Sequence, residues 1–323
     1  MNFQIKQLLE KIISGEKITA DEARFISSNS CDLEELLDCA TKLRMHFSKN
    51  VIHRCSIVNA RSGGCEENCA FCAQSRYHKT EASVYPFLTR AKLLTEAAKA
   101  KDAGVTCFGI VTSGRAVTDK EIDVVVEFLG ECLRMGFPSI GASLGILSYD
   151  QLKRLKDAGL RHYNHNLETS RKFYPSICTT HTWDDRYRTL HHAKRAGLEI
   201  CSGGIFGLGE SWSDRIDMGL TLSELDIRNV PLNFLSPIVG TPLADAPKIS
   251  ADEGLRAIAM YRFILPKAII RICGGRPITF AGRQQDIFRA GASGILTGDY
   301  LTTTGNTFES DNSMVDKAGL RFA

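Results

Sequence analysis

Apolar and polar positions along the chain alternate between two periods. Short apolar runs predict β-strands, and longer segments with apolar residues three and four positions apart predict the helices between them. The expected strands are 53–60, 106–112, 139–144, 161–166, 199–206, 230–235, 268–273 and 294–297. The expected helices are 89–103, 119–135, 148–158, 183–196, 213–225, 251–265 and 283–290.

Glycine marks the end of several of these helices. It is favoured there because it adopts the left-handed conformation without a Cβ clash. Each of these glycines is followed directly by a strand-like run, which is the order of parallel βαβ units. Eight such strands predict an α/β fold of the (β/α)₈ TIM-type barrel class. The helix-ending glycines are Gly104, Gly136, Gly159, Gly197 and Gly291.

The segment before the first strand predicts additional helices. Thr19 and Asp32 each precede an acidic residue by three positions, Glu22 and Glu35, which is typical of a capped helix start. No linker or low-complexity segment follows. We therefore expect two parts, an N-terminal helical extension, 1–50, and a single barrel domain, 51–323.

Composition narrows the class of protein. The 323 residues carry 40 basic and 37 acidic side chains without a long run of one sign, which gives no support for a nucleic-acid or membrane surface. No apolar stretch is long enough to span a bilayer, and no signal peptide is recognisable. Eleven cysteines, an odd number, favour reduced thiols and metal ligands in a cytoplasmic protein over disulfides.

Three cysteines in one short loop carry the strongest chemical signal. Cys65, Cys69 and Cys72 follow the spacing C-x₃-C-x₂-C. Three thiolates can hold a 4Fe–4S cluster and leave its fourth iron open to bind S-adenosylmethionine and cleave it to a 5′-deoxyadenosyl radical. Phe71, directly before the last cysteine, completes a pattern typical of the radical S-adenosylmethionine superfamily. The alternatives are a zinc site, which normally needs a second cysteine pair that the chain lacks, or unrelated thiols.

A second group of cysteines lies on the expected strands. Side chains alternate along a strand, so these thiols and an arginine can meet inside the barrel and hold a second iron–sulfur cluster. The alternative is that they are small apolar core residues. The candidate ligands are Cys55, Cys107, Cys201, Cys273 and Arg271. Other cysteines carry no predicted ligand role: Cys39 and Cys132 on apolar helix stripes, and Cys31 and Cys178 elsewhere.

Amide side chains stand at the ends of two expected strands. Asn164 and Asn166 share one face of their run, and Asn233 lies in the strand 230–235. Amides offer both donors and acceptors, which suits a neutral, urea-like or ribose group. Alternatively, each amide bonds the backbone of a neighbouring loop.

Two further features predict parts of a cofactor pocket. Arg186, early in the helix 183–196, is a candidate carboxylate clamp; the alternative is an ordinary surface arginine. The glycine-rich segment 201–210 lacks the spacing of a phosphate loop. Its glycines are expected to let the backbone approach a cofactor closely.

Taken together, several segments resemble the biotin synthase family. The resemblance spans residues from about 50 to about 305. It implies a (β/α)₈ barrel, usually homodimeric, that converts dethiobiotin to biotin by inserting sulfur between two unactivated carbons. Two deoxyadenosyl radicals are then used per product, and flavodoxin or ferredoxin is the expected electron donor. The segments that carry the resemblance are 65–72, 163–170, 201–210, 230–235 and 240–243, with Arg271.

The resemblance also implies roles residue by residue. The three loop cysteines hold the radical cluster, and Arg186 binds the methionine carboxylate. Asn166 and Glu168 reach the ribose, and Glu168 stands where many members carry Asp, which lengthens the arm. Asn164, Asn166 and Asn233 face dethiobiotin.

The interior cysteines depart from the familiar pattern, in which three cysteines and an arginine hold a 2Fe–2S cluster. Cys201 and Arg271 match two of those ligands, but glycine occupies the other two positions, in the runs 107–109 and 141–145. The remaining interior thiols suggest a relocated, cubane-type auxiliary cluster with an extra sulfide, as in the variant of the family found in anaerobes.

Two competing functions stay open at this point. One is another radical barrel enzyme, related to the hydrogenase-maturation or methylornithine-forming proteins, which should lack the amide set and the interior sulfur ligands. The other is a non-catalytic iron–sulfur scaffold or electron carrier, which needs no S-adenosylmethionine pocket.

Overall fold

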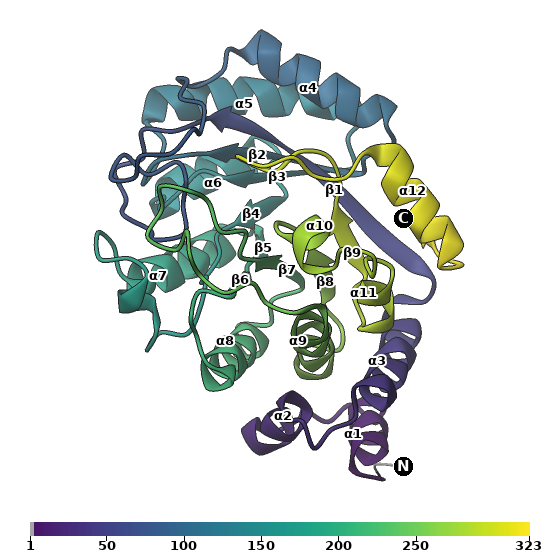
Figure 1. Ribbon diagram of the computed structural model, residues 1–323. Helices are drawn as coiled ribbons and strands as arrows, with labels where there is room; N and C mark the ends of the chain where they lie inside the picture. Colours follow the sequence, from purple (N-terminus) through teal and green to yellow (C-terminus); the bar gives the residue numbers. More distant parts are fainter. Residues whose placement is uncertain (1–2) are drawn as a thin grey trace.

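The computed structural model describes residues 3–323 and shows a closed parallel barrel surrounded by helices (Figure 1). Hydrogen bonding runs in the order β1-β2-β3-β4-β5-β7-β8-β9, and β9 pairs with β1 to close the barrel. The predicted (β/α)₈ class is confirmed. The strands are β1 Val51–Arg61, β2 Cys107–Thr112, β3 Ser139–Ser143, β4 His162–Asn164, β5 Glu199–Cys201, β6 Gly204–Phe206, β7 Asn229–Phe234, β8 Ile269–Ile272 and β9 Gly294–Leu296.

One predicted strand, 199–206, is wrong as a continuous element because it breaks into β5 and β6. Both halves pair with β7, through Cys201 with Asn229 and Gly204 with Leu232. A Cβ at Gly203 would lie 1.9 Å from the carbonyl oxygen of Pro231. The glycines therefore let neighbouring backbones approach one another, and not only a cofactor as expected.

The outer helices begin where the sequence predicts. The residue before each of the six long helices accepts a hydrogen bond from a backbone N–H in the first turn, which satisfies an otherwise unpaired donor. The five helix-ending glycines have φ between 73° and 103°, the left-handed region that favours glycine. These helices are α4 Arg90–Asp102, α5 Asp119–Arg134, α6 Tyr149–Asp157, α7 Trp183–Arg195, α8 Trp212–Glu224 and α9 Ala251–Ile264.

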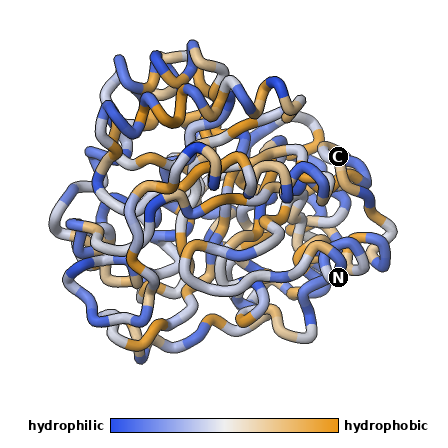
Figure 2. Tube along the Cα trace, turned by 90° about the horizontal axis from the view of Figure 1, so that it is seen from above, coloured by the Kyte–Doolittle hydropathy of each residue, from blue (hydrophilic) through white to orange (hydrophobic). Residues whose placement is uncertain are grey.

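Helices cover the barrel by burying an apolar face against it. The aromatic ring of Phe108 on β2 lies 5.8 Å from Phe137 and 6.5 Å from Phe128 of α5. Figure 2 shows the matching pattern, with hydrophilic and hydrophobic stretches alternating along the peripheral helices.

The C-terminal part differs most from the prediction. The expected helix 283–290 is reduced to α11 Asp286–Arg289. Four elements were not predicted, three of them after residue 275 and one short helix in the middle of the chain. Among these, α12 and β10 close the chain beside β1, where Val51 pairs with Arg321. The unpredicted elements are the 3₁₀ helix η1 Tyr174–Ser176, α10 Arg276–Thr279, α12 Phe308–Lys317 and β10 Arg321–Phe322.

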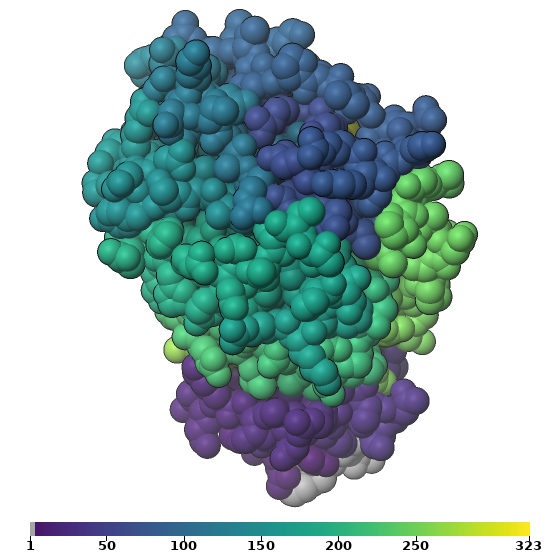
Figure 3. All heavy atoms as spheres, turned by 90° about the vertical axis from the view of Figure 1, so that its left-hand side faces the viewer, coloured from purple at the N-terminus to yellow at the C-terminus, as the bar shows by residue number. Residues whose placement is uncertain are grey.

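The N-terminal helices pack together at one end of the molecule, seen in purple in Figure 3. Thr19 and Asp32 cap α2 and α3 as predicted, and Thr19 forms the complete reciprocal bond with Glu22. Helices α2 and α3 contact α9, and α2 also contacts α8. The predicted extension begins with Met1 and Asn2, which lie outside the described residues. The helices are α1 Phe3–Ile13, α2 Ala20–Ser27 and α3 Leu33–Ser48.

No helix within residues 3–323 is long and apolar enough to cross a membrane.

Candidate active site

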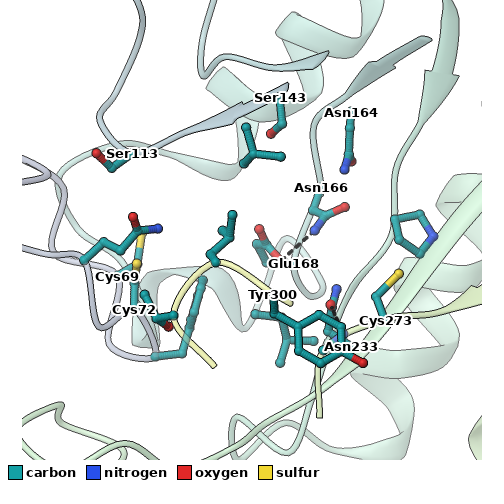
Figure 4. A pocket seen from close by; sticks show the side chains of 18 of the residues that line it. Cys69, Cys72, Ser113, Ser143, Asn164, Asn166, Glu168, Asn233, Cys273 and Tyr300 are labelled. Carbon is teal, nitrogen blue, oxygen red and sulfur yellow. Dashed lines mark hydrogen bonds between the residues drawn. The ribbon is translucent and has the colours of Figure 1, made fainter. Parts of the chain in front are cut away.

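A cavity of about 390 Å³ opens at the carboxyl ends of the barrel strands, where barrel enzymes place their chemistry. In Figure 4, Cys69 and Cys72 lie on one side and Cys273 on the other, with Asn166 and Glu168 between them. The structure thus brings together residues that are more than 200 positions apart in the chain. The sequence-predicted residues in its wall are Cys65, Cys69, Phe71, Cys72, Asn164, Asn166, Glu168, Arg186, Asn233 and Cys273.

The three-cysteine loop is held in shape by its own backbone. The N–H of Cys65 donates to Gln74, 2.9 Å, and the N–H of Cys72 donates to the carbonyl of Cys69, 2.9 Å. Burial raises the pKa of Cys65, and it raises the pKa of Cys72 to about 11. A cationic partner is needed to hold these thiols as thiolates, so the donor set fits an iron–sulfur cluster.

The spacing of the loop thiols also argues against a single metal ion. In the described part of the chain, Cys65, Cys69 and Cys72 are not grouped closely enough to share one ion. A cluster of several irons separates its thiolates more widely than one zinc ion does. The loop therefore fits the cluster better than it fits zinc.

Arg186 is a buried part of this cavity and not a surface arginine. Its side chain is 12% exposed. Nε donates to the hydroxyl of Tyr174 at 2.7 Å, and Nη1 donates to the carbonyl of Asn166 at 2.8 Å. Nη1 also lies 3.5 Å from the carboxylate of Glu168. The guanidinium is thus fixed in the wall, where it can meet an anionic group.

Glu168 occupies a strained backbone position. Its φ is +69°, in the left-handed region that is unfavourable for a side chain of this size. The glycine-rich segment holds it there, because its N–H donates to Gly203 and its carbonyl accepts from Ile205. Burial raises the pKa of Glu168, although Arg186 and the side chain of Asn166 oppose this shift.

The three asparagines differ in what they leave available for a ligand. Both ends of the Asn233 amide are used, since Nδ2 donates to Gly204 at 3.2 Å and Oδ1 accepts from Gly274 at 2.9 Å. The Oδ1 atom of Asn166 accepts from Gly203 at 3.3 Å. In contrast, the buried Oδ1 of Asn164 has no partner. Asn233 therefore follows the backbone-bonding alternative, whereas Asn164 is open to a ligand.

A second cavity of about 80 Å³ lies inside the barrel. It shares Asn164 and Cys273 with the larger cavity, so the two adjoin. Gly109 and Gly141, neighbours across β2 and β3, also line it without offering a ligand. The candidate auxiliary ligands all lie in this wall, namely Cys55, Cys107, Cys201, Arg271 and Cys273.

The electrostatics of the interior cavity suit an iron–sulfur group. Burial raises the pKa of Cys55 to about 11 and that of Cys201 to about 12, and it also raises the pKa of Cys273. Arg271 lies among these thiols, and its buried Nε has no partner. An unpaired buried donor among several thiols is costly unless an acceptor fills the space between them. The cavity therefore fits an electron-rich sulfur-containing group.

Sequence reasoning missed several cavity residues. His162 lines the interior cavity, and the period of two along β4 places it on the face of Asn164, so the pattern could have found it. His165, expected on the opposite face, also reaches the larger cavity, as does Tyr300 after β9. Cys178 lies 3.7 Å from Cys69. No sequence pattern joins two thiols separated by 109 positions.

Comparison with known proteins identifies the family. The chain matches the Radical SAM superfamily over residues 60–221 and the Biotin and Thiamin Synthesis associated domain over residues 231–321. It is 44% identical to a biotin synthase of Citrifermentans bemidjiense, over 99% of this chain and 98% of that protein. The chain belongs to the biotin synthase family. Another member, from Clostridium tetani, is 43% identical over 98% of both chains.

Solved structures show the same fold at low identity. Methylornithine synthase (PylB) superposes with a TM-score of 0.84 at 20% identity, covering 98% of this chain and 97% of its own. The hydrogenase maturase HydG from Carboxydothermus hydrogenoformans gives 0.83 at 19% identity, covering 99% and 79%. These enzymes share the barrel with the family, whereas the full-length identity supports a biotin synthase. The prediction of a radical S-adenosylmethionine enzyme is confirmed, and with it a 4Fe–4S cluster and S-adenosylmethionine as cofactors.

Proposed function

We propose that the chain converts dethiobiotin to biotin, with the radical formed at the cavity mouth and the sulfur supplied from the barrel interior. One observation carries the proposal. The loop thiols and the interior thiols line adjoining cavities, and the unpartnered Oδ1 of Asn164 belongs to a residue that both cavities share. A substrate in this position lies between the two sulfur-ligated groups.

The cysteine loop and the opposite wall of the cavity bind different parts of the cofactor system. Cys65, Cys69 and Cys72 would hold the 4Fe–4S cluster, and with bound S-adenosylmethionine this group would supply the deoxyadenosyl radical. Arg186 receives the methionine carboxylate through its planar fork. Asn166 and Glu168 accept from the ribose hydroxyls, while Phe71 covers the cofactor from the loop.

Dethiobiotin recognition rests mainly on Asn164. Its open carbonyl oxygen accepts from an N–H of the ureido ring, and this contact satisfies a buried acceptor that otherwise has no partner. Asn166 and Asn233 line the same cavity. Because the amides of Asn166 and Asn233 already bond the backbone, these residues mainly fix the shape of the cavity. Their remaining lone pairs can still accept from the substrate.

The interior thiols Cys55, Cys107, Cys201 and Cys273, with Arg271, hold an auxiliary iron–sulfur cluster. We propose a cubane-type cluster with an extra sulfide, because glycines replace two ligands of the 2Fe–2S pattern while other thiols line the same cavity. The group held by these thiols would supply the sulfur atom. Two C–H bonds of dethiobiotin would break, each hydrogen would be taken by one deoxyadenosyl radical, and the two electrons left over as the sulfide forms two C–S bonds would pass to the irons of the cluster.

Iron and acid-labile sulfide per chain, with Mössbauer spectra, test the two-cluster proposal after anaerobic reconstitution. A variant with Cys65, Cys69 and Cys72 replaced by alanine should keep about four irons in the auxiliary cluster. Cys107→Ala and Cys273→Ala should each lose auxiliary iron and biotin formation but still cleave S-adenosylmethionine. Cys132→Ala, at a buried thiol of α5 outside both cavities, is the control. If Cys107→Ala and Cys273→Ala keep full iron content and turnover, the proposal is wrong.

Partners and assembly follow the family expectation. We propose a homodimer in the cytoplasm that receives electrons from flavodoxin or ferredoxin. We further propose that the barrel, 51–323, is one domain and that 1–50 is an extension of it. Light scattering of the full chain tests the dimer, and dethiobiotin turnover with each purified donor tests the electron source.

A further inference from the structure

A second group of metal-ligating side chains lies behind the three-cysteine loop. The Sγ atom of Cys178 is 3.7 Å from that of Cys69 and 3.3 Å from Nδ1 of His181. The ligand atoms of the three residues all lie within 4.8 Å of one another, and all three residues are buried. Two bonds fix this arrangement, since Ala70 N–H donates to Ile177, 2.8 Å, and Asn68 bonds the segment that follows Cys178.

These distances match one tetrahedral ion. Zinc binds thiolate sulfur at about 2.3 Å and imidazole nitrogen at about 2.0–2.1 Å, which places two sulfurs about 3.8 Å apart and sulfur and nitrogen about 3.6 Å apart. The observed separations are 3.7 Å and 3.3 Å. Within residues 3–323 no other cysteine joins such a group. The group therefore has the dimensions of a mononuclear site.

Glu67 lies beside this group and bonds its imidazole. Its Oε2 lies 2.6 Å from Nδ1 of His181, and its side chain is 7% exposed. Arg115 pairs with the other carboxylate oxygen at 3.2 Å, which helps to neutralise a donor set with two thiolates. The carboxylate therefore positions the imidazole, and its negative charge close to the group favours a bound cation.

We propose that Cys69, Cys178 and His181 bind a single divalent, thiolate-preferring cation, such as Zn²⁺ or Fe²⁺, in the cluster-free chain, with Glu67 beside the imidazole as a positioning residue. The cation displaces the two thiol protons, and the single ring proton of His181 moves from Nδ1 to Nε2. Cys69 cannot ligate this ion and the 4Fe–4S cluster at the same time, so the two exclude each other. This exclusion rests on the proposed function.

Cation binding also breaks the hydrogen bond between Arg186 and His181. In the empty site, Nε2 of His181 accepts from Nε of Arg186 at 3.1 Å, while Nδ1 faces Glu67. A cation on Nδ1 leaves the proton of the ring on Nε2, where it faces the N–H of Arg186. Two donors repel, so the occupied site displaces Arg186 from its present position.

Cobalt(II) is the probe for a direct test, because its thiolate complexes absorb in the visible and near-ultraviolet. The starting chain carries Cys65→Ala and Cys72→Ala, which remove the radical cluster but keep Cys69. Adding Cys178→Ala should lower bound Co²⁺ by one equivalent and remove the corresponding thiolate absorption. Cys132→Ala in the same background should bind as the starting chain does. The interior thiols contribute equally to all three titrations.

Two further variants keep the test decisive if Cys178→Ala folds poorly. His181→Gln should lose the same equivalent, and Glu67→Gln should bind with roughly 10-fold lower affinity and unchanged stoichiometry. Unchanged Co²⁺ binding and spectrum in folded Cys178→Ala or His181→Gln would overturn the site.

A separate measurement tests the exclusion of the cluster. Prior addition of one equivalent of Zn²⁺ should slow iron uptake by the unmodified chain and leave the Cys178→Ala chain unaffected. Equal slowing in both chains would show that zinc acts elsewhere. The Co²⁺ titration needs no turnover, so its outcome is independent of the proposed function.

Discussion

At the scale of single residues, ligand recognition depends on which polar atoms the fold leaves without partners. Asn164 and Asn233 line one cavity, but only Asn164 among the two has a buried amide oxygen without a partner. Asn164→Ala should therefore weaken dethiobiotin binding by about 5- to 150-fold, since a buried hydrogen bond of this kind contributes about 1–3 kcal/mol. Equilibrium binding to the reconstituted protein measures this change.

Asn233→Ala is the matched variant. Its amide bonds Gly204 and Gly274, so its loss should lower the free energy of unfolding by about 1–3 kcal/mol. Dethiobiotin affinity should fall less than in Asn164→Ala. An equal loss of affinity in both variants would contradict the distinction drawn from their hydrogen bonds.

His162 gives the interior cavity a pH dependence. Burial, with a further contribution from the nearby charge of Arg271, lowers the pKa of His162 to about 4, although Glu199 lies 3.3 Å away and opposes the shift. Between the ordinary pKa of about 6.5 and this value, the unfolded chain binds a proton that the folded chain does not. Stability should thus fall as pH drops through this window, by about 3 kcal/mol at most.

Urea unfolding of the cluster-free chain at several pH values between 7 and 4 checks this expectation. His162→Gln removes the titrating group and should show a shallower loss of stability in the same window. A constant difference between parent and variant at every pH would mean that His162 binds its proton equally well in both states.

At the scale of elements, the break between β5 and β6 is the feature on which the site depends most. Gly203 donates its N–H to Asn166, and a Cβ there would meet the carbonyl of Pro231 at 1.9 Å. Gly203→Ala should therefore lower the free energy of unfolding by about 2 kcal/mol or more and weaken S-adenosylmethionine binding. Thermal unfolding and equilibrium binding measure the two effects.

Gly130→Ala is the control for this substitution. Gly130 lies within α5, and the nearest atom to an added Cβ is 3.9 Å away, in the flexible side chain of Arg134. Alanine should stabilise the helix by about 0.5–1 kcal/mol there. If Gly203→Ala changes the free energy of unfolding by a similarly small amount, then β7 moves to make room for the added methyl group.

The same break shows where sequence patterns reach their limit. The long helices could be predicted because Thr and Ser caps, apolar spacing and terminal glycines all act within one segment. The interruption at Ser202 and Gly203 could not, because it depends on contact with Pro231 on a neighbouring strand. Helix α12 was missed for a similar reason, since its buried Asp311 gains its partner from distant Arg276.

At the scale of the whole molecule, closure of the barrel brings the site residues together. Strand alternation predicted which side chains face inward, and all the candidate auxiliary ligands line one cavity. Strand alternation does not show which buried polar atoms have hydrogen-bond partners. The difference between Asn164 and Asn233 therefore became visible only in the structure. The neighbourhood of Cys69, Cys178 and His181 required it too, because it joins two loops that no repeat relates.

The closing seam, where β9 meets β1, is secured by a buried ion pair from the C-terminal region. Arg276 of α10 and Asp311 of α12 form two bonds of 2.8 Å, and both side chains are fully buried. Arg276 also donates to the carbonyl of Leu296 on β9 at 3.2 Å, and Leu296 lines both cavities. The pair therefore connects the C-terminal helix to the wall of the site.

Asp311→Asn should lower the free energy of unfolding by about 3–5 kcal/mol, because it leaves a buried guanidinium without its counter-charge. Asp316→Asn, at an exposed position of the same helix, should change it by less than about 0.5 kcal/mol. Denaturant unfolding of both variants measures the difference. Because the pair supports β9, Asp311→Asn should also reduce the iron retained by the interior thiols, whereas Asp316→Asn should not. Equal stability of the two variants would mean that the seam holds without the pair.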